Sequence, residues 1–223
     1  MDRLDFLHKI VDKIQSIKLE RPVIVGIDGI DCAGKTTFAE ELKEIFEVRK
    51  HTTIRASIDG FHRPREERLA QGELSPKGYY EDSFDYPFLI ENLLKPLKEF
   101  SPGLRIKTKK FDFRSNEEVG SEEIEIKANS LVLFEGVFLF RPELEKYWDY
   151  KIFVDIDFQT SLQRGLERDG KWMGGDSITE RKYRERYIPG QQIYLKSVNP
   201  KFKADIVFNN VNPKQPNLED TNS

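Results

Sequence analysis

The sequence is poor in the residues that build disulfides and zinc sites. It contains one cysteine, Cys32, and three histidines, His8, His51 and His62, within 223 residues. A single cysteine cannot form a disulfide within the chain, and the histidines lack the short spacing of metal ligands. We therefore expect no zinc site, and we expect Cys32 to fill space in a protein of a reducing compartment.

Long apolar runs and an excess of one charge are also absent. No apolar stretch approaches the length that spans a bilayer, and residues 1–5 lack the basic and then apolar order of a signal peptide. The 36 basic and 39 acidic residues give a net charge of −3, which leaves no electrostatic footprint for nucleic acid. These absences predict a cytoplasmic protein that binds neither membranes nor nucleic acid.

The most informative segment that is present lies at residues 29–36. Its sequence, GIDCAGKT, matches the phosphate-binding pattern G-x-x-x-x-G-K-[ST] at every fixed position. An apolar, β-branched run at residues 22–28 precedes it, and apolar residues at helical spacing follow it. This order predicts a strand, a glycine loop and a helix whose N-terminus attracts phosphate. The segment therefore predicts a nucleoside triphosphate site.

The residues of this loop have distinct expected roles. Lys35 should reach the β- and γ-phosphates and take part in catalysis, and Thr36 Oγ should ligate Mg²⁺. The other nucleotide contacts are expected from Gly29, Asp31, Cys32, Ala33, Gly34 and Thr37. The expected cofactors are ATP, or GTP in its place, and Mg²⁺.

The rest of the chain alternates strands with helices. Strands are predicted at residues 52–58, 131–135, 151–155 and 204–208, and helices at 1–20, 85–97, 158–169 and 177–188. Pro96 should bend or end the second of these helices. Such alternation favours an α/β fold with a parallel sheet.

Several segments interrupt this alternation. The polar stretch from Gly60 to Asp82 is predicted to be a long loop that is functional or mobile. Residues 104–127 are predicted to form a β-hairpin beside the sheet, and 164–190 a lid. The lid breaks at Gly170 to Asp176, and an S-x-x-E capping pattern opens its second helix.

These elements predict one domain with a short extension. Residues 1–208 should form a single domain around the glycine loop that includes the N-terminal helix. That helix should pack on the sheet, although it could also mediate a homo-oligomer. The tail, residues 209–223, is rich in Asn and Pro and is expected to be frayed.

Acidic residues follow two of the predicted strands. Asp59 ends the strand at 52–58, and Glu135 ends the strand at 131–135. Because the carboxyl ends of parallel strands meet where ligands bind, both should lie beside the phosphate loop. A carboxylate there accepts the proton of an attacking hydroxyl or holds a metal ion. We assign Asp59 as the base, with Glu135 and Asp59 at the metal; the alternative for both is a turn residue.

Basic and aromatic residues offer further contacts. Arg164 and Arg168 share one face of a predicted helix, and guanidinium groups suit a phosphoryl group in transfer. Arg168, the last before the glycine break, is the preferred catalytic arginine, although a solvated surface is the alternative. Arg181, Arg184 and Arg186 follow in the lid, and His62 is the histidine nearest to Asp59. His62 and Arg164 are candidates for binding substrate.

The order of these motifs resembles the uridine kinase family of P-loop nucleoside kinases, within the phosphoribulokinase/uridine kinase group. The resemblance runs from about residue 23 to 208, and its motifs are residues 29–37, IDGFHR at 58–63, FDY at 84–86, FDF at 111–113, FEG at 134–136 and ADIV at 204–207. It implies the P-loop NTPase fold, with a five-stranded parallel sheet flanked by helices, a β-hairpin insertion and a helical lid.

The same resemblance implies an activity, the phosphorylation of the 5′-hydroxyl of uridine or cytidine in pyrimidine salvage. By it, Asp59 is the general base, Thr36 and Glu135 organise Mg²⁺, and arginines of the lid stabilise the transferring phosphoryl group.

The proposed substrate contacts depart from the pyrimidine-recognising members. Those members have a Tyr a few positions before a His in the hairpin, where this chain has Phe111 and Asn116. They also have a Tyr three residues after the catalytic Asp, where this chain has His62. Phe111 can stack on a ring but lacks a polar atom, and Asn116 changes the hydrogen-bond pattern. Two alternatives stay open: a kinase of another alcohol, such as pantothenate or a sugar phosphate, and a non-catalytic nucleotide-binding regulatory protein.

Overall fold

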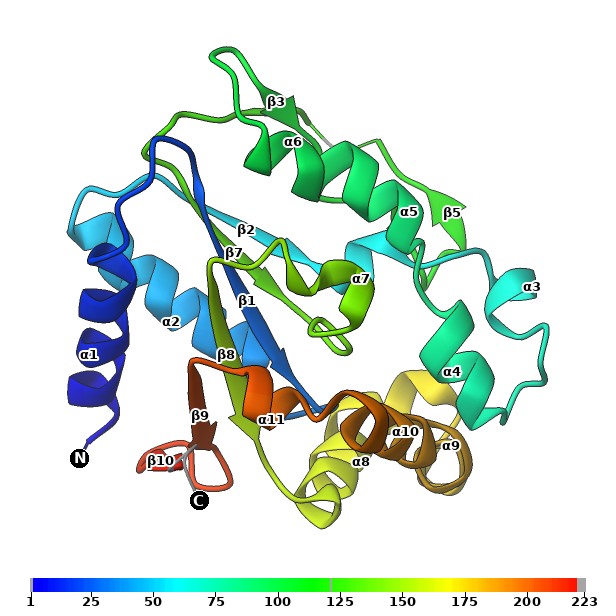
Figure 1. The fold of residues 1–223 in the computed structure, drawn as a ribbon. Helices are drawn as coiled ribbons and strands as arrows, with labels where there is room; N and C mark the ends of the chain where they lie inside the picture. Colours follow the sequence, from blue (N-terminus) through cyan, green and yellow to red (C-terminus); the bar gives the residue numbers. More distant parts are fainter. Residues whose placement is uncertain (1, 121, 220–223) are drawn as a thin grey trace.

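A six-stranded sheet forms the centre of the protein (Figure 1). The structure is a computed structural model that describes residues 2–120 and 122–219. The strand order is β10 (Asn217–Glu219), β9 (Ile206–Asn209), β8 (Tyr150–Asp155), β1 (Val23–Gly29), β7 (Leu131–Glu135) and β2 (Thr53–Ser57). The five strands from β9 to β2 are parallel, and β10 pairs antiparallel with β9. The predicted α/β fold with five parallel strands is confirmed.

Helices cover both faces of this sheet, so its inner strands β1, β7 and β8 have buried side chains on both sides. Figure 1 shows α1 (Arg3–Gln15) and α2 (Lys35–Val48) on one face, and α5 (Tyr86–Leu89), α6 (Lys95–Lys98) and α7 (Pro142–Glu145) on the other. The side chains of β1 alternate accordingly, because Ile24 joins the core under α5 and Val25 joins the core under α1. The N-terminal helix therefore packs on the sheet, as the sequence predicts, but it ends at Gln15.

Residues 209–219 differ from the expected frayed tail. Leu218 of β10 pairs with Phe208 of β9, so the chain returns along the sheet edge. Asn210 is buried and donates its Nδ2 to the carbonyl of Ala33 at 2.7 Å. A strand of three residues carries too little hydrophobic pattern to be visible in the sequence. The rest of the predicted tail, residues 220–223, lies outside the described residues.

Two helical segments pass through a proline without ending. The π-helical turn η2 (Ile90–Leu94) precedes Pro96 in α6, and η3 (Tyr183–Tyr187) precedes Pro189 in α10 (Ile188–Val198). Proline lacks an N–H and clashes with the carbonyl four residues earlier, and a π turn widens the helix at that point. Pro96 consequently does not end the helix, which continues to Lys98.

The stretch from Gly60 to Asp82 is more ordered than a plain loop. It contains part of η1 (Ile58–Phe61), then α3 (Arg65–Arg68) and α4 (Pro76–Asp82). Arg186 of η3 is buried and donates to four carbonyls of this stretch, those of Arg68, Gly72, Glu73 and Ser75. The buried guanidinium of Arg186 thus links residues 68–75 to the lid by hydrogen bonds.

The break between the first two helices of the lid falls later in the chain than the sequence predicts. Helix α8 (Phe158–Met173) passes through Gly170, and the break falls at Gly174 and Gly175, whose φ angles are +102° and +106°. Glycine adopts this left-handed conformation without steric cost, which explains the position of the break. Ser177 lies inside α9 (Asp176–Lys182) and does not cap it.

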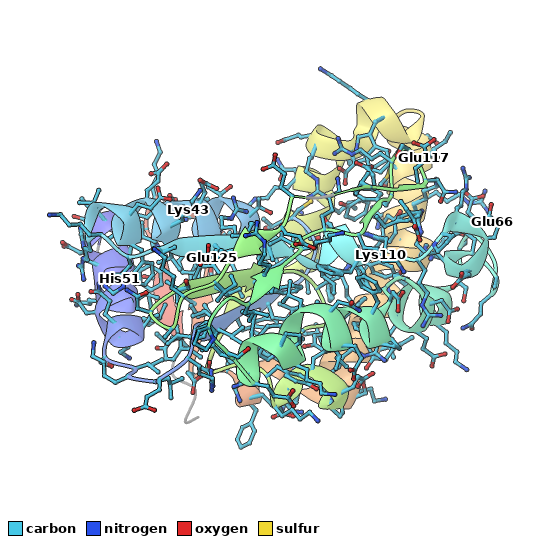
Figure 2. All side chains as sticks on the ribbon, turned by 90° about the horizontal axis from the view of Figure 1, so that it is seen from above. Lys43, His51, Glu66, Lys110, Glu117 and Glu125 are labelled. Carbon is cyan, nitrogen blue, oxygen red and sulfur yellow. The ribbon has the colours of Figure 1, made fainter. Side chains whose placement is uncertain are left out.

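The predicted hairpin consists of two short antiparallel ladders. One joins β3 (Arg105–Ile106) to β6 (Ile124–Glu125), and the other joins β4 (Phe111–Asp112) to β5 (Glu117–Glu118). Figure 2 shows Glu125 and Glu117 at opposite ends of this hairpin, with Glu117 at the end near the yellow helix α8. Within the described residues, no helix is both long and apolar enough to cross a membrane.

Gly26 provides a test of the packing on β1. A Cβ at Gly26 would lie 2.8 Å from Cδ2 of Trp148. Gly26→Ala therefore displaces the indole, and we expect a loss of about 1–3 kcal/mol in the free energy of unfolding, measured with urea. Gly120→Ala is the matched control, because a Cβ at Gly120 meets nothing within 4 Å. Equal stability of the two variants contradicts this packing.

Candidate active site

Three parallel strands bring their carboxyl ends together. Glu135 at the end of β7 pairs with Ile27 of β1 on one side and with Ser57 of β2 on the other. β1 then leads into the glycine loop, and β2 leads into η1, which contains Asp59. Ligands of open α/β sheets bind at this edge, where the strand order reverses. The sequence prediction that the loop, Asp59 and Glu135 share one edge of the sheet is confirmed.

The glycine loop presents a free helix N-terminus. Gly34 has a φ of +91° and precedes α2, whose N-terminus has no side-chain cap. Thr36 and Thr37 are exposed in the first turn of α2, whereas Lys35 is only 7% exposed. The Nζ of Lys35 donates to the carbonyl of Ile30 at 2.8 Å, across the loop. Uncapped N–H groups and a lysine folded over the loop suit the binding of phosphate.

Side chains from α4 and α10 hold the loop from outside. Asp31 accepts hydrogen bonds from the Tyr79 hydroxyl and from Nε2 of Gln191, each at 2.9 Å. Its backbone N–H donates to Oε1 of Gln191 at 2.7 Å. Burial raises the pKa of the Asp31 carboxyl, and the charge of Lys35 opposes this shift. The Asp31 carboxylate is thus engaged by protein groups, and sequence patterns gave no sign of its two partners.

Cys32 sits in the same loop with a left-handed backbone, φ +59°. Its sulfur lies 3.3 Å from the hydroxyl of Tyr183, and burial raises the pKa of its thiol. A neutral thiol is a poor nucleophile, which agrees with the expected space-filling role.

A second buried aspartate lies beneath the loop. Asp28 is fully buried in β1, accepts the N–H of Gly29 at 2.7 Å, and accepts a hydrogen bond from the hydroxyl of Tyr194. Burial raises the pKa of Asp28 to about 6, although these donors oppose the shift. The position where the strand turns into the loop is therefore held by a buried polar pair.

A cavity of about 570 Å³ opens beside the strand ends. Its lining includes Ser57 and Asp59 from the end of β2 and η1, Phe111 and Phe113 from the hairpin, and Arg168 and Trp172 from α8. Pockets of this size hold small organic ligands. The hairpin, the lid and the end of β2 with Asp59 thus all contribute to the wall of one cavity.

The two carboxylates of the site share one electrostatic environment. Asp59 is open to the cavity, yet protein surrounds its carboxylate closely enough for desolvation to raise its pKa, against the charges of Lys35 and Arg168. Glu135 is 6% exposed, and burial followed by the charge of Asp59 raises its pKa, while Lys35 lowers it. Two carboxylates that disfavour each other's ionisation favour a cation between them.

The donor set fits a Mg²⁺ ion that arrives with a nucleotide. Between residues 2 and 219, apart from residue 121, no three His, Cys, Asp or Glu side chains form a metal-binding group. Mg²⁺ in kinases needs no such cage, because phosphates and water supply most of its ligands. Thr36, Glu135 and Asp59 are the residues that would hold it.

Arg168 and its neighbour form the best-defined polar cluster of the lid. Nε and Nη2 of Arg168 donate to the two carboxylate oxygens of Asp169 at 2.7 and 2.8 Å. Asp169 is buried and also accepts from the Tyr183 hydroxyl at 2.8 Å and from Nε1 of Trp172 at 3.2 Å. Arg168 therefore lies in the cavity wall with its guanidinium plane fixed by Asp169.

The other candidate arginines lie elsewhere. Arg164 donates to the carbonyls of Cys32, Asn210 and Val211, so it lies along the glycine loop and outside the cavity lining. Arg181 and Arg184 form exposed ion pairs with Glu185 and Glu180 on the lid surface. Of the five lid arginines, the structure brings Arg168 to the cavity.

Of the four proposed substrate residues, Phe111 alone lines the cavity. The ring of His62 packs between Phe84 and Phe113, with centroid distances of 4.5 and 4.8 Å, and burial lowers its pKa to about 4. Asn116 lies in the hairpin turn at φ +59° and accepts the N–H of Arg65 at 2.8 Å. His62 thus packs on Phe113 of the cavity wall, whereas the side-chain oxygen of Asn116 is engaged by Arg65 outside the lining.

Sequence reasoning missed Trp172 and Asp169. Trp172 is spaced four residues from Arg168 and eight from Arg164, so helical periodicity alone places the three on one face. The predicted helix end at Asp169 hid this relation, because α8 continues to Met173.

Residues 24–215 match the sequence model of the phosphoribulokinase/uridine kinase family. The chain belongs to this family. It is 32% identical to uridine-cytidine kinase B of Dictyostelium discoideum over 151 aligned residues. The aligned region covers 67% of this chain and 59% of that protein. It is 29% identical to the uridine kinase of Clostridium novyi over 163 aligned residues, which cover 72% of this chain and 75% of that protein. The aligned part thus spans less than two thirds of the first relative's length and three quarters of the second's.

Solved structures share the fold of this chain. A possible uridine kinase from Bacillus stearothermophilus superposes with a TM-score of 0.72 at 23% identity, over 91% of this chain and 97% of that one. D-glycerate 3-kinase from Cryptococcus neoformans superposes with a TM-score of 0.59 at 14% identity, over 96% of this chain and 97% of that one. These likenesses show the fold, and family membership identifies a P-loop kinase of small molecules that binds a nucleotide.

The raised pKa of Asp28 predicts a pH dependence of stability. An ordinary aspartate in the unfolded chain titrates near pH 4, whereas Asp28 in the folded chain titrates at about 6. Between these values the folded protein holds a proton that the unfolded chain releases, so stability falls as pH rises through this window. Relative to Asp28→Asn, the wild type should lose up to about 3 kcal/mol between pH 4 and 7, measured by urea unfolding. A difference between the two proteins that stays constant with pH contradicts the assignment.

Proposed function

We propose that this kinase transfers the γ-phosphoryl group of Mg-ATP to a hydroxyl group of a small acceptor, and that uridine or cytidine is that acceptor. The observation that carries the proposal is the position of Asp59. Its carboxylate lines the cavity beside the glycine loop, and the charges of Lys35 and Arg168 act on it directly. An acceptor hydroxyl in this cavity lies between a base and the nucleotide.

Each chemical role has a residue at the strand ends. Asp59 accepts the proton of the acceptor hydroxyl as its oxygen bonds to the γ-phosphorus, and the bond from that phosphorus to the β-phosphate oxygen breaks. Lys35 binds the phosphates, and Arg168 offers its guanidinium to the phosphoryl group in transfer. Thr36, Glu135 and Asp59 would hold a Mg²⁺ ion, which when bound neutralises phosphate charge.

The assignment of uridine or cytidine is supported by the relatives and by the aromatic cavity. The relatives compared above are named uridine or uridine-cytidine kinases, and Phe111, Phe113 and Trp172 give the cavity three aromatic rings. A flat nucleobase gains affinity from such rings.

A second acceptor class is favoured by two positions of the hairpin. Phe111 offers no polar atom to a base edge, and Asn116 uses its side-chain oxygen on Arg65. The site therefore shows fewer base-reading groups than one built to select a single nucleobase. Another alcohol, such as pantothenate or a sugar phosphate, is the alternative acceptor.

An acceptor panel separates these classes. ADP release from Mg-ATP is measured with uridine, cytidine, pantothenate and sugar phosphates, each against a reaction without acceptor, and GTP is tested in place of ATP. We expect turnover with uridine or cytidine. Turnover confined to another alcohol keeps the mechanism and replaces the acceptor, and nucleotide binding without turnover favours the regulatory alternative.

Asp59→Asn tests the base. The amide cannot accept the hydroxyl proton, so kcat should fall by about 10²- to 10⁴-fold while the affinity for ATP stays close to that of the wild type. Asp112→Asn is the matched control, because Asp112 lines the same cavity but is paired with Lys109 at 2.9 Å. Its kcat should change by less than about fivefold. Equal losses in the two variants contradict a specific role for Asp59.

A further inference from the structure

Trp172 is an exposed aromatic residue in the wall of the acceptor cavity. Its side chain is 47% exposed, whereas Trp148, the other tryptophan in the sequence, is 6% exposed within the core. A large aromatic side chain left open beside a cavity gains most of its burial when a ligand packs on it. So far this indole has been counted only as one of three aromatic rings in the cavity, without a position of its own against the acceptor.

The orientation of Trp172 is fixed before any ligand binds. Its Nε1 donates to the Asp169 carboxylate at 3.2 Å. That carboxylate is itself 3% exposed and is held by Arg168 and by the hydroxyl of Tyr183. Because the indole is already oriented, less conformational entropy is lost when an acceptor packs against it.

The same indole packs against the hairpin in the cavity wall. Its ring centroid lies 6.1 Å from that of Phe113, at an interplanar angle of 66°. The guanidinium of Arg114 lies 5.5 Å from the ring of Trp172. Phe111, which is 3% exposed, lines the cavity from the hairpin side. The lid and the hairpin thus present aromatic surface to one space.

We propose that Trp172 binds the phosphate acceptor, and that its indole is the lid-side wall against which a planar ring of the acceptor packs. This inference rests on the proposed kinase activity and narrows its acceptors to alcohols that carry a planar ring, such as nucleosides. Stacking depends little on the identity of the base, so Trp172 supplies affinity for the ring and does not separate uracil from cytosine.

Tryptophan fluorescence tests the contact without turnover. The protein with Mg-ADP is titrated with uridine, and with ribose as the probe that lacks the base. We expect uridine to change the emission of the wild type and ribose to leave it unchanged. Trp172→Phe keeps Trp148 as its single tryptophan, and its emission should not respond. A response of the same size in Trp172→Phe contradicts the contact.

Kinetics separate acceptor binding from a structural role. Trp172→Ala should raise the KM for the acceptor by about tenfold or more and change the KM for ATP by less than about twofold. Trp172→Phe keeps a ring but loses the donor to Asp169, so it should retain an acceptor KM within about threefold of the wild type. Ile178→Ala is the control, because Ile178 of α9 is also 47% exposed but lies outside the cavity lining, and its acceptor KM should not change.

The failures of the two proposals are distinguishable. If the wild type turns over and Trp172→Ala keeps its acceptor KM, the role of Trp172 is wrong and the kinase activity stands. If only acceptors without a ring turn over, the narrowed substrate class is wrong. If Trp172→Phe and Trp172→Ala lose kcat equally with unchanged KM, the indole acts through Asp169 and does not bind the acceptor. Absence of turnover with every acceptor contradicts the proposed function as well.

Discussion

The parallel pairing of β7 between β1 and β2 is the constraint on which the site depends. It aligns Glu135 with Ile27 on one side and with Ser57 on the other, so the strand ends stay in fixed register. A slip of one residue would turn Glu135 away from the face it now shares with Asp59 and Lys35. Helix packing on both faces of the sheet enforces this register, because β1, β7, β8 and β9 each have apolar side chains in both cores, and β2 has Ile54 and Ala56 in one of them.

Buried polar contacts then give the glycine loop a single conformation. Asp28 and Asp31 lie below and within the loop, and they accept hydrogen bonds from Tyr194, Tyr79 and Gln191. Burying two carboxylates costs free energy, which their raised pKa values express. In return, the loop is connected to α4 and α10 before a nucleotide binds, so the loss of conformational entropy on binding is smaller.

The lid is connected to the same loop through Arg164, which donates to the carbonyl of Cys32, and through the hydroxyl of Tyr183. Tyr183 of η3 donates to Asp169 and lies against the sulfur of Cys32. Asp169 in turn orients Arg168 and Trp172 at the cavity. A displacement of the lid therefore moves the arginine and the indole together, relative to both the glycine loop and the hairpin.

Local pattern was sufficient to predict the sheet, the glycine loop and the carboxylates at the strand ends. These features follow from buried β-branched runs, from a motif with fixed spacing, and from the rule that parallel strands end at one edge. Sequence reasoning failed where periodicity alone does not decide. The π turns that carry the chain past Pro96 and Pro189, and the late break at Gly174, are local backbone adjustments that the hydrophobic pattern does not reveal. The contacts that Arg186 makes depend on carbonyls distant in sequence.

Among the proposed substrate residues, too, some positions were predicted correctly from the sequence and others were not. Phe111 was predicted from its motif and lines the cavity, whereas His62 and Asn116 are engaged by Phe84, Phe113 and Arg65. A motif fixes where a residue lies along the chain, but the partner that its side chain finds depends on the packed structure. Trp172 lies in no motif, and its position in the cavity follows from the length of α8.

Phosphorus NMR of a mixture of the protein, Mg-ATP and uridine tests the central claim most directly, because it identifies where the phosphoryl group goes. The account predicts a phosphomonoester resonance of the acceptor that grows in step with ADP and is absent with Asp59→Asn. Growth of inorganic phosphate alone, with no phosphomonoester from uridine, cytidine or any other alcohol supplied, would contradict phosphoryl transfer to an acceptor bound beside Asp59.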